Sequence, residues 1–84
     1  MAAQSGTVAS PAAYTTDPQV SLGFEPNTLV LKTTSGTSVV SFDGVNDHLT
    51  LANTDPMISL FTKFKKIWFK QSGGASNINW SAIT

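Results

Sequence analysis

Turn-forming residues interrupt this chain so often that only short strands fit between them. Gly, Pro and clusters of Asn or Asp recur about every ten residues, and the stretches between them are rich in β-branched and apolar side chains. With 84 residues there is room for one small domain. The pattern predicts an all-β fold, a small antiparallel β-sandwich or barrel. We expect strands over residues 28–33, 38–42, 48–51, 67–70 and 78–83.

The last two of these strands flank a turn with two consecutive glycines, Gly73 and Gly74. This arrangement predicts a final β-hairpin, with Trp68 on one arm and Trp80 on the other. Two tryptophans placed in this way would stack across the hairpin and contribute to the core. If they instead face outward together with Phe61 and Phe64, they form an aromatic patch that anchors a partner protein.

Residues 60–70 also fit a second interpretation. One helical face would hold the apolar residues Leu60, Phe61, Phe64, Ile67 and Trp68. Lysines lie broadly opposite, as in a basic amphipathic helix at a membrane or a partner groove. The run Ile67-Trp68-Phe69 favours a strand, and the glycine pair follows soon after it. We therefore predict a strand here, approached by a loop or single turn over residues 59–64.

The first 19 residues differ in composition from the rest of the chain. Small and polar residues dominate, and only Val8 and Tyr14 have apolar bulk. Such a segment cannot offset its own chain entropy by burial, so we expect an extended N-terminal arm over residues 1–19 and a single β-domain over 20–84. The arm either straps onto a neighbouring subunit through Val8 and Tyr14, which is the interpretation we favour, or folds back on its own domain.

Several function classes are disfavoured by residues that the chain lacks. There is no Cys and no Arg, and His48 is the one histidine, so we expect no enzyme activity, no metal and no cofactor. Asp43, Asn46 and Asp47 suit a calcium loop, but Asx turns explain the same residues. His48 beside Asp43 or Asp47 suits a general base, but the sequence marks no nucleophile for it, and a partly exposed strand histidine is the simpler interpretation.

Charge is balanced in sum but not along the chain. Residues 1–60 hold all five acids and one lysine, whereas residues 61–84 hold four lysines and no acid. This asymmetry suits a head-to-tail contact between subunits or docking on an acidic surface, although lysines also protect sheet edges from unwanted pairing. A chain this small, without disulfides or metals, is expected to gain stability as a homo-oligomer. The neutral net charge and the lack of Arg argue against nucleic acid, and we expect no membrane partner, because no apolar run is long enough and no secretory signal is evident.

Five short segments carry a family resemblance: Phe24-Glu25-Pro26-Asn27-Thr28-Leu29-Val30-Leu31, Val40-Ser41-Phe42-Asp43-Gly44, His48-Leu49-Thr50-Leu51, Lys66-Ile67-Trp68-Phe69-Lys70 and Gly73-Gly74. Together they resemble small virion proteins of tailed bacteriophages. The resemblance implies a β-domain that decorates or cements the capsid, or a minor head or tail component, located in the virion and assembled in the host cytoplasm. Its partners would be the major capsid protein or other virion subunits, and no catalytic residues carry over.

A second resemblance involves residues 41–48 alone. Ser41-Phe42-Asp43-Gly44-Val45-Asn46-Asp47-His48 is similar to the opening strand of laminin-G-like, concanavalin-type lectin domains, with His48 where an aromatic residue is usual. Those jelly rolls are longer than this chain. The alternative function that follows is a glycan-binding adhesion module on a virion or cell surface, using the loop from Asp43 to His48 and an exposed Trp68 or Trp80.

Overall fold

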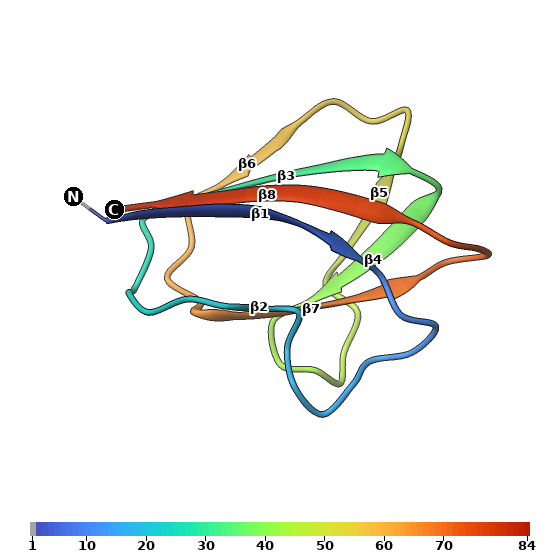
Figure 1. Ribbon diagram of the computed structural model, residues 1–84, viewed down its shortest axis with the longest axis horizontal. Helices are drawn as coiled ribbons and strands as arrows, with labels where there is room; N and C mark the ends of the chain where they lie inside the picture. Colours follow the sequence, from blue (N-terminus) through green and yellow to red (C-terminus); the bar gives the residue numbers. More distant parts are fainter. Residues whose placement is uncertain (1) are drawn as a thin grey trace.

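Two four-stranded antiparallel sheets make up the fold (Figure 1). The computed structural model describes residues 2–84. The strand order is β1-β8-β3-β6 in one sheet and β2-β7-β4-β5 in the other. The predicted all-β class and the β-sandwich are therefore confirmed. The strands are β1 (Ala3–Ala9), β2 (Val20–Ser21), β3 (Thr28–Ser35), β4 (Thr37–Ser41), β5 (Leu49–Ala52), β6 (Ile58–Leu60), β7 (Lys66–Gln71) and β8 (Asn77–Ile83).

The core lies between the two sheets and follows the two-residue period of the strands. In β3, Leu29 and Leu31 are fully buried, while the residues between and beside them are only partly buried. Ile67 and Phe69 of β7 and Ile78 of β8 are also fully buried. Fully burying an apolar side chain of this size contributes roughly 1.5–3 kcal/mol, so these alternating positions hold the two sheets together.

The predicted final hairpin is wrong, because β7 and β8 belong to different sheets. β7 lies between β2 and β4, and β8 lies between β1 and β3. The connection with Gly73 and Gly74 therefore crosses from one sheet to the other, and Trp68 and Trp80 do not stack across a hairpin. The physical reason is that each strand presents apolar side chains to the core. When β7 and β8 face one another across the core, the apolar side chains of both strands are buried. Each strand also gains two hydrogen-bonded neighbours in its own sheet.

Residues 58–71 form two strands rather than a helix. β6 pairs with β3, and β7 pairs with β4 in the other sheet, so the helix-like spacing joins residues from opposite layers. Alternating burial in β7, with Ile67 and Phe69 inside and Trp68 half-buried, confirms the predicted strand. Over residues 2–84 the chain forms no helix able to cross a membrane.

The N-terminal segment lies on its own domain. β1 pairs with β8 along its whole length, and Val8 packs partly buried against the core. Residues 10–19 then pass to the other sheet, where the Gln71 backbone N–H donates to the Pro11 carbonyl at 2.7 Å. The N-terminal segment from residue 2 to residue 19 is therefore folded back on its own domain, which is the second of the two arrangements expected from the sequence. Residue 1 lies outside the described residues.

A buried serine cluster fixes the point where the chain leaves β1. The Oγ atoms of Ser10 and Ser38 are 3.0 Å apart, and Ser38 Oγ donates to Ser76 Oγ at 2.7 Å. The Ser10 backbone N–H also donates to the Ser76 carbonyl at 2.9 Å. All three residues are buried, and because they bond to one another their hydroxyls are not left unsatisfied. The cluster ties β1 to β4 and to the β7–β8 connection.

Candidate binding surface

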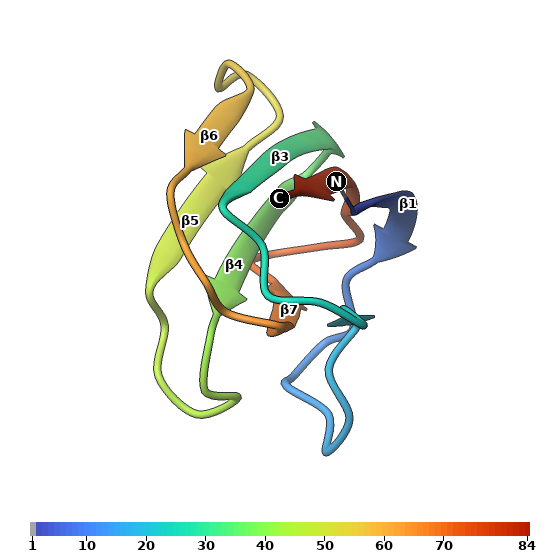
Figure 2. The ribbon, with the colours of Figure 1, turned by 90° about the vertical axis from the view of Figure 1, so that its left-hand side faces the viewer.

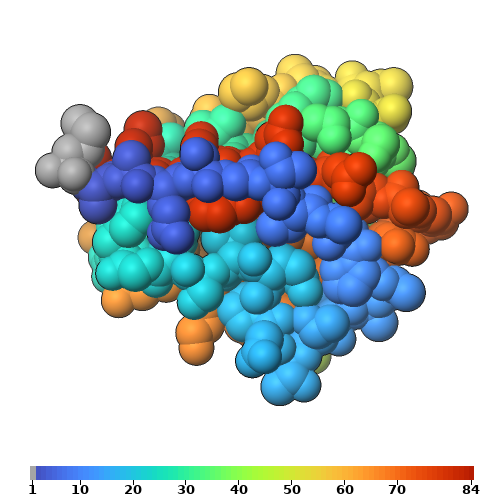
Figure 3. Space-filling view, viewed as in Figure 1, coloured from blue at the N-terminus to red at the C-terminus, as the bar shows by residue number. Residues whose placement is uncertain are grey.

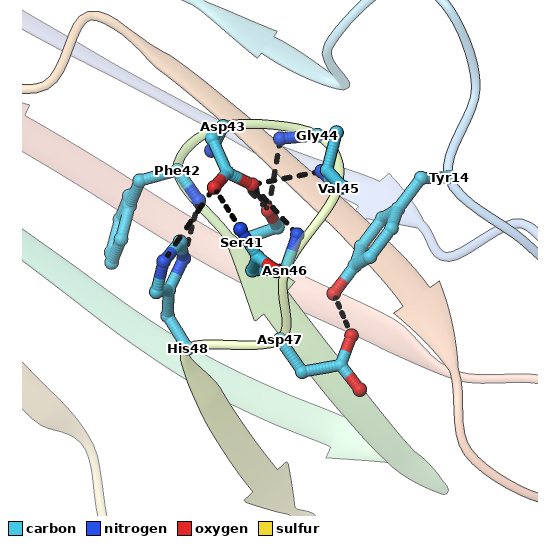
Figure 4. Close-up of polar contacts among 9 residues, drawn as sticks. All are labelled: Tyr14, Ser41, Phe42, Asp43, Gly44, Val45, Asn46, Asp47 and His48. Carbon is cyan, nitrogen blue, oxygen red and sulfur yellow. Dashed lines mark hydrogen bonds and ion pairs between the residues drawn. The ribbon is translucent and has the colours of Figure 1, made fainter.

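The loop between β4 and β5 is built around the carboxylate of Asp43 (Figure 4). Asp43 Oδ1 accepts the backbone N–H groups of Val45 and Asn46, both at 2.8 Å, and Oδ2 accepts the Asn46 amide at 2.8 Å. The Asn46 backbone N–H, followed by that of Val45, holds the pKa of Asp43 well below its usual value. The carboxylate oxygens are thus occupied within the loop, as the Asx-turn interpretation predicts. Residues 2–84 contain no cluster of three metal-ligating side chains.

Gly44 rests directly against the indole of Trp68. Its φ is +78°, in the left-handed region, and a Cβ atom there would lie 2.9 Å from Trp68 Cε2. Ser41 Oγ accepts the Gly44 backbone N–H at 2.9 Å and closes the turn. Trp68 Nε1 donates to the Thr15 carbonyl at 3.1 Å. Trp68 is therefore a half-buried support for the loop and for the N-terminal segment.

His48 is fixed by the same loop. Its Nδ1 accepts the Phe42 backbone N–H at 3.0 Å, so the proton of the neutral ring lies on Nε2. Nε2 is 3.9 Å from Asp43 Oδ2. The ring also stacks on Phe42 with centroids 5.6 Å apart. These contacts hold His48 against Phe42 and Asp43, one residue before β5, so His48 does not lie in a strand as predicted. They bring no nucleophile to the ring.

The Tyr14 side chain contacts Asp47 and Lys70 of the same domain. Its hydroxyl donates to Asp47 Oδ1 at 2.7 Å, and Lys70 Nζ is 3.0 Å from the same oxygen and 4.8 Å from the Tyr14 ring centroid. Burial, and next the hydrogen bond to Asp47, raise the pKa of Tyr14 well above its usual value. The Tyr14 hydrogen bond, followed by Lys70, lowers the pKa of Asp47. The network ties the segment after β1 to the Asp43 loop.

A basic aromatic patch covers the connection between β6 and β7 and the first residue of β7. We define it as Phe61, Lys63, Phe64, Lys65 and Lys66. Phe61 is 91% exposed and Phe64 is 52% exposed, although the Phe64 ring stacks on Phe42 with centroids 4.9 Å apart. Lys63 Nζ is 3.6 Å from Glu25 Oε1, whereas Lys65 and Lys66 make no ion pair with the described residues. The patch therefore offers apolar surface beside excess positive charge. A shallow hollow adjoins it, lined by Glu25, Phe42, Lys63, Phe64, Lys65, Lys66 and Trp68.

The six candidate partner-binding residues do not form one surface. Phe64 and Trp68 meet at the hollow, with Phe61 nearby in sequence. Tyr14 is engaged by Asp47, and Val8 and Trp80 lie on paired strands of the other sheet, where both pack against the core.

Phe42 and Glu25 also line the hollow, although no sequence motif marked them as site residues. Phe42 lies in both of the segments with a lectin-like or virion-protein resemblance, and Glu25 lies in a virion-protein segment, but neither resemblance gives them a role.

Compared with protein-family models, with curated proteins and with solved structures, the chain has no match. Its function is therefore inferred from its own residues and their arrangement.

Proposed function

We propose that this chain is a non-enzymatic structural protein of a tailed-bacteriophage particle. It decorates or cements the capsid by binding shell subunits after they have assembled. Its partners are the major capsid protein or other virion subunits, and its location is the virion, assembled in the host cytoplasm. The sequence resemblance supports this proposal, and the structural observation that carries it is the basic aromatic patch.

The patch has the composition of a protein-binding surface. Phe61 and Phe64 are large, apolar and exposed, and aromatic residues of this kind are the usual anchors of interfaces. Burying each against a partner contributes roughly 1.5–3 kcal/mol. Lys65 and Lys66 favour an acidic partner surface and accelerate encounter with it.

The proposed mechanism is thermodynamic. If the patch contacts a surface that only neighbouring shell subunits create together, the protein binds the assembled shell more tightly than free subunits. Binding then stabilises the assembled state by mass action. No bond is made or broken in this process.

The test is reconstitution on particles that lack the protein. Purified chain is mixed with such virions and binding is measured by co-sedimentation, for wild type, for F61A/F64A and for M57A. Met57 is 65% exposed but lies outside the patch, so M57A is the matched control. We expect F61A/F64A to bind about tenfold more weakly or worse, and M57A to bind as wild type does. Equal binding by F61A/F64A and wild type would reject the patch as the attachment site, and no binding by wild type would reject the function.

The hollow beside the patch favours a second candidate, a glycan-binding adhesion module. Phe42, Phe64 and Trp68 line the hollow, and aromatic faces combined with a few polar groups are typical of small-ligand sites. A glycan array probed with and without calcium tests this candidate. Binding of a defined glycan that is lost in F64A would support it, and no ligand under either condition would exclude it.

A further inference from the structure

The outer edge of β1 is a row of backbone groups with no hydrogen-bond partner among residues 2–84. We propose that β1 pairs antiparallel with β1 of a second copy of this chain, with the two-fold axis passing through Gly6. Two copies would then share one continuous sheet across this edge. The inference goes beyond virion attachment and can be tested on the isolated protein.

The ladder between β1 and β8 shows which backbone groups are free. The Thr84 N–H donates to the Ala2 carbonyl at one end, and the Ser10 N–H donates to the Ser76 carbonyl at the other. The register between these bonds has no shift, so the even-numbered residues bond to β8. The N–H and C=O groups of the odd-numbered residues therefore point away from the sheet. These residues are Ala3, Ser5, Thr7 and Ala9.

This edge carries none of the usual protection against pairing. β1 is seven residues long and has no Pro and no charged residue, and the whole strand is exposed apart from the half-buried Val8. In contrast, β2 at the edge of the other sheet has two residues, and β6 at the far edge of the same sheet has three. Natural proteins shorten, charge or cover their edge strands to prevent association. Figures 2 and 3 show β1 at the outside of the fold and uncovered along the surface.

The sequence of β1 is complementary to itself about Gly6. A two-fold axis there pairs Ala3 with Ala9 of the second copy and Ser5 with its Thr7, so residues of similar size lie opposite one another. All of these residues have outward backbone groups, so each pair exchanges both hydrogen bonds. The two Gly6 residues meet in a non-hydrogen-bonded pair, where strands approach most closely. If the two-fold axis passed through any other residue of β1, one end of the strand would extend past the second copy and stay unpaired.

The two-fold arrangement closes on itself and gives a dimer rather than a fibre. We expect sedimentation equilibrium of the wild-type chain to show a concentration-dependent species of twice the 8.9 kDa monomer mass. In S5K/T7K, each new lysine faces a lysine of the other copy, so this variant and S5E/T7E should each be monomeric. An equimolar mixture of the two should restore the dimer, because every facing pair is then of opposite charge. The control is T54K/S59K, which adds the same charge at exposed positions outside β1 and should dimerise as wild type does.

Each outcome decides the proposal. A wild-type chain that is monomeric up to about 1 mM overturns it, since a useful interface binds more tightly than that. A folded S5K/T7K variant that still dimerises places the interface elsewhere. Failure of the mixture to restore dimers rejects the register. Particle binding is not used in these measurements, so their failure is distinct from failure of the proposed attachment.

Discussion

Replacing Gly44 by alanine tests how strongly the Asp43 loop depends on Trp68. At this position two costs combine, a left-handed backbone and a contact with a rigid ring at 2.9 Å. A comparison with Gly73 distinguishes the two costs, because Gly73 also has a left-handed backbone, with a φ of +88°, but a Cβ there would meet nothing within 4 Å. G73A therefore carries the backbone cost alone, and G44A carries both.

The magnitudes follow from the two costs. A left-handed conformation costs an L-residue roughly 1–2 kcal/mol, which is the expected loss in G73A. Forcing a methyl group against well-packed atoms adds about 1–3 kcal/mol. G44A should therefore lose about 2–5 kcal/mol of unfolding free energy in total. For a domain of this size, each kcal/mol lowers Tm by roughly 4–8 °C.

The assay is urea denaturation of wild type, G73A and G44A, followed by tryptophan fluorescence. A W68L background completes a double-mutant cycle, because the smaller side chain removes the contact but leaves the backbone cost. G44A should then cost about as much in W68L as G73A costs in wild type. Equal losses for G44A and G73A in the wild-type background would refute the claim that the loop rests on the indole.

Three further predictions concern the core and the pH dependence of stability. F69A should lose about 3–5 kcal/mol by denaturant titration, because Phe69 is fully buried between the sheets; a loss below about 1 kcal/mol would contradict that packing. The folded-state pKa of Asp43 lies below its unfolded value, so its contribution to stability is present above pH about 4 and is lost as the pH falls further. D43N should therefore show a smaller decline in urea midpoint between about pH 5 and 2 than wild type, and parallel curves would count against the carboxylate contacts. The folded-state pKa of Tyr14 lies above its unfolded value, so its contribution is present below about pH 10 and is lost as the pH rises further. Y14F should remove that part of the alkaline decline, and an unchanged alkaline profile would reject the Tyr14–Asp47 contact.

The candidate surface was only partly predictable from the sequence. The sequence indicates Phe61 and Phe64 as candidate anchors, and both are exposed. Trp68 and Trp80 carry the same aromatic signal, but Trp68 supports the turn at Gly44 and Trp80 packs against Gly6 on the core side of its sheet. The residue type alone does not show whether an aromatic side chain binds a partner or supports its own fold. The difference depends on whether another part of the chain covers the ring.

The local features of the fold follow from the sequence alone. Two-residue alternation and frequent turn formers determine the all-β class and the positions of β3, β4, β5 and β7, and Asp43 organises its own turn through neighbouring amides. Each of these properties depends on interactions within a few residues. Which strands pair is a different matter, because it depends on burying apolar faces that are far apart in the chain. The placement of β7 and β8 in opposite sheets and of β1 at an exposed edge therefore depends on contacts between distant parts of the chain.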